Sequence, residues 1–187
     1  QSNYHTYGSL TAVMQGFALT YPGLTRLESL GQSVEGRELW ALLITDNPNT
    51  EEDEPEFKYV STMHGDEPVG TELCVNFIEM LLTEYGTDSQ ITELVNETAI
   101  WIVPLMNPDG HAAIRRANAN GFDLNRSFPS FPEDYTGTMF SGEPLGDGVR
   151  QPEIAHVMRW TAANSFTLSA NLHTGALLVN YPYDNIP

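Results

Sequence analysis

The chain has 187 residues, an apolar fraction of 41% and a formal net charge of -17 at pH 7. That length suits one domain with a buried core, whereas the charge argues against nucleic-acid binding, because phosphates require basic surfaces. No run of 18 apolar residues occurs, so the sequence predicts no membrane span. The single cysteine, Cys74, excludes an internal disulfide and leaves the redox compartment undecided.

The hydrophobic pattern predicts alternating helices and strands along the chain. The predicted helices cover residues 9–20, 69–85, 89–96 and 152–163. The predicted strands cover residues 24–30, 38–45, 57–63, 99–105, 166–172 and 177–179, and the first two form a hairpin. The segment 110–148 is predicted to be a long functional loop. This alternation predicts an α/β sandwich with helices on both faces of the sheet.

The helix predicted over residues 69–85 carries an apolar stripe, which predicts one face packed against the sheet. The members of this stripe are Val69, Leu73, Phe77, Met80 and Leu81. Cys74 lies in the same apolar run and is predicted to be an inert core residue rather than a reactive thiol.

Two predicted strands each end at a histidine. His64 follows the strand over residues 57–63 and precedes Glu67 by three positions, and His173 follows the strand over residues 166–172. A histidine at that spacing from a glutamate is common by chance and often forms only a surface pair. However, ligands gather at the carboxyl ends of strands in open α/β sheets, so these three side chains can converge. Two histidines and one glutamate leave the fourth position of a zinc ion open for water, which is typical of a catalytic site.

Basic residues, although scarce, cluster between the two histidines. Arg115, Arg116 and Arg126 are three of the eight lysines and arginines of the chain. A guanidinium group matches a carboxylate bidentately, so arginines near a metal suggest a substrate carboxylate and a polarised carbonyl. The alternative, that these arginines neutralise surrounding acids, is equally open at this point.

Several short motifs occur in an order that is typical of one family. They are Met63–Gly70, Pro104–Gly110, Asn120–Arg126, Gln151–Glu153, Asn171–Gly175 and Asn180–Asp184. On these motifs the chain resembles the zinc metallocarboxypeptidases, and within them the regulatory subfamily of carboxypeptidases N, E, M and D. The resemblance runs from about residue 64 to the end, and it implies a mixed β-sheet with helices on both faces.

The resemblance also implies roles at the metal. His64, Glu67 and His173 match the ligands of one zinc ion. Arg116 matches the arginine that polarises the scissile carbonyl and stabilises the oxyanion. Arg115 competes for this role, but the spacing to the Asn-Arg pair downstream favours Arg116.

Further matches concern the substrate. Asn125 and Arg126 match the pair that binds the terminal carboxylate of a peptide, and Asp184 matches an acid in the pocket for the C-terminal side chain. An acid at that place implies a preference for lysine or arginine. The implied partners are therefore peptide or protein C-termini, and the implied location is extracytoplasmic, either secreted or periplasmic. The acidity of the chain would attract cationic peptides at long range, or it serves only solubility.

Three features depart from the family pattern. Thr174 replaces a glycine after the second histidine, and Ser127 creates a glycosylation sequon at Asn125 that must stay unused if the site is to remain open. The general base of the family is a glutamate several dozen residues after the second histidine, so we expect it beyond Pro187. We therefore interpret residues 1–187 as the N-terminal portion of a single catalytic domain.

These observations predict a zinc-dependent exopeptidase that removes a C-terminal residue, with a preference for lysine or arginine. One alternative is a domain of the same fold that binds peptides without cleaving them. A second is a zinc amidase that acts on a small metabolite or a cell-wall peptide. A third is an adhesion module in which the motifs are accidental.

Overall fold

The computed structural model describes residues 4–129 and 150–181 of the chain. Its regular elements follow the alternation that the sequence predicts. In chain order they are α1 (Tyr7–Thr20), β1 (Thr25–Gln32), β2 (Glu38–Ile44), β3 (Glu56–Ser61), α2 (Val69–Glu84), α3 (Ser89–Asn96), β4 (Ala99–Val103), α4 (Pro108–Ala112), the short 3₁₀ helix η1 (Leu124–Arg126), α5 (Pro152–Ala163) and β5 (Phe166–Leu172). Among the described residues, no helix is both long enough and apolar enough to cross a membrane.

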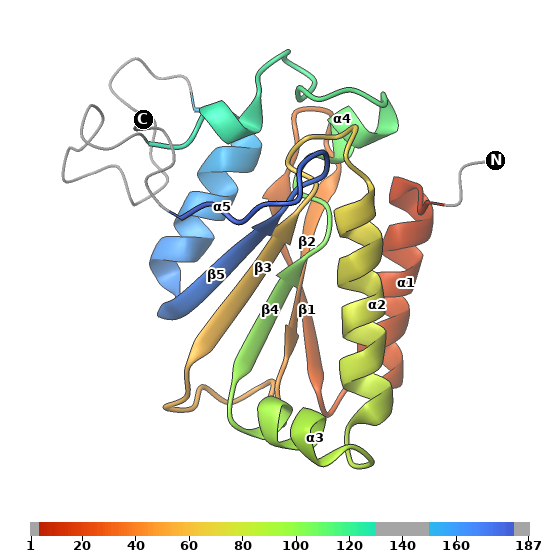
Figure 1. Cartoon of the computed structure of the whole chain (residues 1–187), viewed down its shortest axis with the longest axis vertical. Coiled ribbons are helices and arrows are strands. Elements are labelled where there is room, and N and C mark those ends of the chain that lie inside the picture. The colour runs from red at the N-terminus through yellow and green to blue at the C-terminus, as the bar shows by residue number, and fades with distance from the viewer. Residues whose placement is uncertain (1–3, 130–149, 182–187) are drawn as a thin grey trace.

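The five strands form one mixed sheet in the order β1-β2-β4-β3-β5 (Figure 1). The hairpin strands β1 and β2 are antiparallel, and β2 is also antiparallel to β4. By contrast, β3 runs parallel to both of its neighbours, β4 and β5. The carboxyl ends of β4, β3 and β5 therefore lie together at one edge of the sheet.

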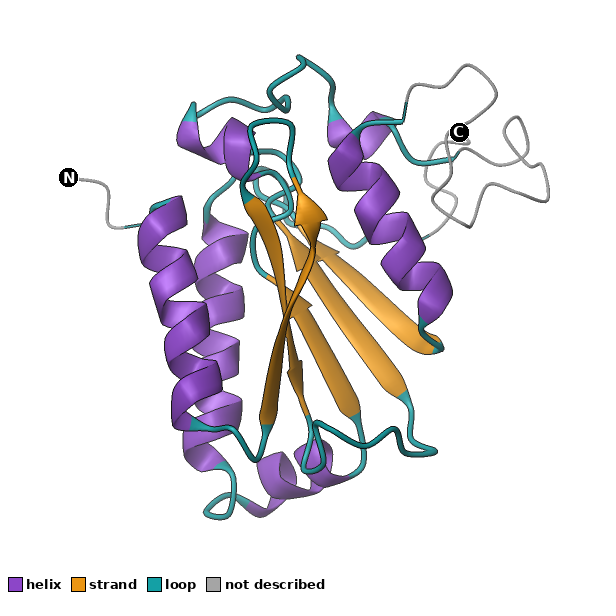
Figure 2. Cartoon of the chain, turned by 180° about the vertical axis from the view of Figure 1, so that it is seen from behind, coloured by secondary structure: helices purple, strands orange, loops and turns teal. Residues whose placement is uncertain are grey.

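Helices cover both faces of the sheet, as the sequence predicts. Side chains alternate along β2, so that Leu39, Ala41 and Leu43 enter one core while Leu42 and Ile44 enter the other. The first core packs against α5, and the second packs against α1 and α2. Figure 2 shows the two helices α1 and α2 side by side across the sheet from α5. The fold is thus an α/β sandwich with a mixed sheet.

The buried face of α2 differs from the predicted stripe. Of the predicted stripe, Leu81 is buried and Phe77 packs against the core, whereas Val69, Leu73 and Met80 are exposed. The buried stripe is shifted around the helix axis and includes Cys74 and Ile78. The stripe begins at Gly70, where a Cβ atom would lie 2.0 Å from the hydroxyl oxygen of a serine at the end of β3. The close approach of helix and strand at this small residue selects the buried face, and apolar content alone does not reveal it.

Other boundaries differ for local reasons. Helix α1 begins earlier than predicted, because Thr6 and Ser9 form a capping box. Strand β3 ends at Ser61, because the backbone of Thr62 has a φ of 52° and turns the chain. The strand predicted over residues 177–179 is absent, and the predicted loop 110–148 includes the end of α4 and all of η1 within its described part.

Candidate active site

The register of the sheet brings the two histidine-bearing segments together. Val60 of β3 pairs with Asn171 of β5, and the next pair lies at the ends of both strands. His64 and His173 therefore leave the sheet at the same edge, with ring centroids 4.9 Å apart. Two segments more than a hundred residues apart in the chain thus form one site.

The turn that carries His64 is fixed by close backbone packing. Gly65 has no room for a side chain, since a Cβ atom there would lie 2.1 Å from the carbonyl carbon of Gly110. Buried Asn107 joins the surrounding segments. Its side-chain oxygen accepts from Gly110 N (2.9 Å), and its side-chain nitrogen donates to Met63 O (3.1 Å) and Arg116 O (3.2 Å). These contacts fix the backbone next to His64 relative to the backbone of Arg116.

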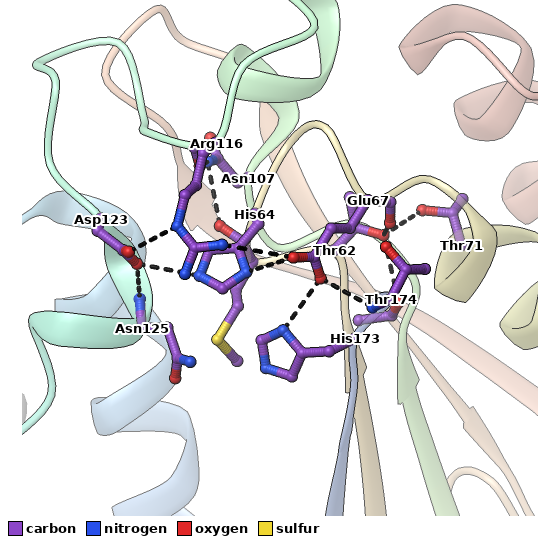
Figure 3. Close-up of polar contacts among 12 residues, drawn as sticks. Thr62, His64, Glu67, Thr71, Asn107, Arg116, Asp123, Asn125, His173 and Thr174 are labelled. Carbon is purple, nitrogen blue, oxygen red and sulfur yellow. Dashed lines mark hydrogen bonds and ion pairs between the residues drawn. The ribbon is translucent and has the colours of Figure 1, made fainter. Parts of the chain in front are cut away.

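Glu67 lies between the two histidines (Figure 3). Its two carboxylate oxygens lie 2.9 Å from His64 Nδ1 and 3.1 Å from His173 Nδ1. His64, Glu67 and His173 can each supply one ligand atom, and these three atoms all lie within 4.8 Å of one another. Two ligands on a tetrahedral zinc are about 3.3 Å apart when each metal–ligand bond is about 2.0–2.1 Å long. The three side chains therefore fit a single zinc ion with only small adjustments.

The charge state of Glu67 suits a metal ligand. Burial raises its pKa, but hydrogen bonds from Thr174 N and His64 outweigh burial, so the pKa lies below its ordinary value. The Thr174 N–H donates to the carboxylate over 3.0 Å. Thr174, which departs from the family pattern, thus contributes to the site through its backbone.

Asp123 is a site residue that the sequence analysis missed. His64 Nε2 lies 3.0 Å from Asp123 Oδ1, and Arg116 Nε donates to Asp123 Oδ2 over 2.9 Å (Figure 3). A carboxylate on one ring nitrogen fixes the tautomer and leaves the other nitrogen as the electron-pair donor. The available signal was a carboxylate between the two basic positions, seven residues after Arg116 and two residues before Asn125.

Arg116, and not Arg115, reaches the metal ligands. Its Nη1 lies 3.5 Å from Glu67 Oε1, and its side chain is half exposed. Arg115 is exposed, and its backbone N–H donates to Gly110 O over 2.9 Å. Of the two arginines, the structure thus places Arg116 beside the candidate ligands.

The Asn-Arg pair lies in η1, directly after Asp123. Asn125 N donates to Asp123 Oδ1 over 2.9 Å, so the half-buried Asn125 lies beside the metal ligands (Figure 3). Arg126 is exposed, and within the described part of the chain it forms no ion pair. Asp184 lies outside the described residues.

Comparisons with known proteins agree with this picture. Residues 10–187 match the family described as zinc carboxypeptidase. Carboxypeptidase D of Rattus norvegicus is 46% identical over 193 residues, which cover 98% of this chain and 13% of that protein. The carboxypeptidase N catalytic chain of Homo sapiens is 41% identical over 204 residues, which cover 97% of this chain and 44% of that protein. The crystal structure of carboxypeptidase A from Helicoverpa armigera superposes with a TM-score of 0.75 at 25% identity, covering 92% of this chain and 46% of that one.

The structure is a mixed α/β sheet that carries a candidate His-Glu-His metal site at the ends of its parallel strands. The chain belongs to the zinc carboxypeptidase family. The resemblance drawn from the sequence motifs is therefore confirmed. The chain spans less than half the length of the relatives named above.

Proposed function

We propose that this chain forms part of a zinc-dependent exopeptidase that removes the C-terminal residue of peptides or proteins. The observation that carries the proposal is the convergence of His64, Glu67 and His173 beside Arg116. When bound by these ligands, zinc lowers the pKa of a coordinated water to near 7 and polarises a carbonyl group. The remaining chemistry belongs to the residues of the chain.

Arg116 supplies positive charge where the oxyanion forms. Its guanidinium is fixed through Nε by Asp123, while Nη1 faces the metal ligands. A donor held in place before the reaction stabilises developing charge without reorganisation. We therefore assign Arg116 to polarisation of the scissile carbonyl.

Asn125 and Arg126 restrict the reaction to chain ends. An exposed guanidinium without an acidic partner among the described residues is available to bind a substrate carboxylate bidentately. A free carboxylate exists only at a C-terminus or on an acidic side chain. We assign the pair to recognition of the terminal carboxylate, and we assign Asp184 to the preference for lysine or arginine.

Two further elements complete the proposal. We place residues 10–187 within one zinc carboxypeptidase catalytic domain. The substrates are extracytoplasmic peptides or proteins, in either a secreted or a periplasmic setting. The family and the relatives support a peptidase.

The test uses the intact zinc-loaded protein and two peptides that both end in arginine, one with a free carboxylate and one amidated. Mass spectrometry should detect loss of arginine from the free peptide only, and a metal chelator should abolish the loss. Cleavage of both peptides would favour an amidase. Binding of the free peptide without any cleavage would favour the non-catalytic alternative.

A further inference from the structure

The motif Gln151–Glu153 has no role in the mechanism above, yet it is buried at the start of α5. The carboxamide of Gln151 and the carboxylate of Glu153 both accept a hydrogen bond from the side chain of Asn118. Asn118 Nδ2 donates to Gln151 Oε1 over 2.9 Å and to Glu153 Oε2 over 3.1 Å. Asn118 and Glu153 have no exposed surface. Burying a polar group costs free energy, which hydrogen bonds must offset. The partners of this buried cluster therefore need to be traced.

The side chain of Asn118 uses both of its donor hydrogens and both acceptor sites of its oxygen. Its side-chain oxygen accepts from the backbone N–H groups of Asn120 (3.1 Å) and Phe122 (3.0 Å), while its nitrogen makes the two bonds described above. A carboxamide offers two donors and two acceptor sites, and no other side chain of that size does so. The backbone adds a bond from Asn118 N to Phe122 O over 2.9 Å. Asn118 thus closes the loop 118–122 from within.

That loop separates the two ends of the substrate-binding segment. On one side, Arg116 O accepts from Gly65 N over 3.3 Å, which fixes the start of the segment against the metal turn. On the other side, Asp123 accepts from Arg116 Nε and from Asn125 N. The closed loop therefore sets the distance between Arg116 and the Asn-Arg pair.

Further hydrogen bonds hold Glu153, the residue behind Asn118. The second oxygen of Glu153 accepts from Val34 N over 3.3 Å, in the turn between β1 and β2. The same turn is held by buried Asp109, which accepts from Ser33 Oγ (2.7 Å) and Arg37 Nη1 (2.6 Å). Burial raises the pKa of Glu153 above its ordinary value, although hydrogen bonds from its own backbone N–H, from Asn118 and from Val34 N partly oppose that effect. The carboxylate is therefore fixed between α5 and the hairpin.

We propose that Asn118, held by Gln151 and Glu153, is a positioning residue that aligns Arg116 with the Asn-Arg pair for a peptide C-terminus. The inference rests on the proposed exopeptidase function. The proposal explains why the motif is buried. Arg116 and the Asn-Arg pair can act on the same substrate only when the distance between them is fixed. A misplacement of about 1 Å can lower a rate roughly a hundredfold.

The kinetic test is a double-mutant cycle in the intact protein with Asn118→Ala and Arg116→Ala. Asn118→Ala should lower kcat/KM by roughly 10–100-fold in the wild-type background, because the arginine is displaced. In the Arg116→Ala background the same change should have a much smaller effect. Val95→Ala is the matched control, since Val95 is fully buried in α3 at the opposite end of the sheet (Figure 1). It should lower the melting temperature and leave kcat/KM unchanged.

A second measurement does not depend on activity. Hydrogen exchange of the Asn125 amide, which donates to Asp123 and not to Asn118, should accelerate in Asn118→Ala and not in Val95→Ala. Unchanged exchange at Asn125, or equal effects of Asn118→Ala in both kinetic backgrounds, would overturn the proposal. If the wild-type protein releases no C-terminal residue, the exopeptidase function fails, and exchange at Asn125 still decides whether Asn118 positions the segment.

Discussion

His64 and Asp123 are joined at the site, with His64 Nε2 3.0 Å from Asp123 Oδ1, while His64 Nδ1 faces Glu67 at 2.9 Å. The two ring nitrogens thus have separate tasks. One holds the orientation of the ring, and the other is directed toward the metal position. A carboxylate in this arrangement raises the basicity of a ligand histidine.

The first prediction follows from this pair. Asp123→Asn should weaken zinc binding by about 10–100-fold, because the amide cannot replace the charge that supports His64. Competition with a chromophoric chelator measures the affinity. The control is Asp66→Asn, which removes the same charge from an exposed neighbour of His64. Equal affinities for wild type and Asp123→Asn would exclude this supporting role.

The second prediction concerns backbone packing at the metal turn. Gly65→Ala should destabilise the protein by roughly 1–3 kcal/mol, because the new Cβ meets backbone that cannot move aside. Gly16→Ala is the matched control, since Gly16 lies within α1 with nothing within 4 Å of a Cβ. That change should stabilise the protein by roughly 0.5–1 kcal/mol. Thermal unfolding of both variants gives the answer, and equal effects would contradict the packing account.

The sequence identifies the three candidate ligands but not the residues that surround them. His64, Glu67 and His173 could be found because each stands at or just after the end of a predicted strand. The register between β3 and β5, which brings the histidines together, depends on pairing between distant segments and cannot be read locally.

The roles of the supporting residues were missed for a related reason, although both residues lie within the family motifs. Asp123 and Glu153 are acidic residues in an acidic chain, so composition gives them no distinction. Their roles depend on contacts with His64 and Asn118, which lie 59 and 35 positions away. The buried face of α2 was predicted only in part, because apolar residues occur on more than one side of that helix and close packing at Gly70 decides between them.

The third prediction concerns Lys58, the only lysine of the chain. Burial lowers its pKa from 10.5 to about 8, and the ammonium group donates to Thr161 Oγ1 and lies 4.8 Å from the centre of the Phe166 ring. The unfolded chain therefore binds the proton more readily between pH 8 and 10.5. The destabilisation is complete below pH 8 and fades as the pH rises toward 10.5.

Lys58→Met should therefore stabilise the protein at pH 7 by roughly 1–2 kcal/mol after allowance for solvent screening. The advantage of the variant should shrink between pH 8 and 10.5. Denaturant unfolding at several pH values measures the difference in the free energy of unfolding between wild type and variant. The titration of other groups cancels in this difference. A difference that is constant with pH would contradict the assignment.

The fourth prediction concerns Cys74, which is buried in α2. Burial raises the pKa of its thiol to about 12, so the reactive thiolate is scarce at neutral pH. The folded protein should not react with a disulfide-exchange reagent at pH 8, whereas the denatured chain should release one equivalent of the chromophore. Rapid reaction of the folded protein would show that the thiol is not buried between α2 and the sheet.

The central claim is that His64, Glu67 and His173 form one zinc site. Its most direct test is the zinc content of the intact protein after reconstitution and gel filtration, measured beside the His173→Ala variant. The account predicts close to one zinc per chain in the wild type and little or none in the variant. A wild type without zinc, or a variant that keeps the full content, would contradict it.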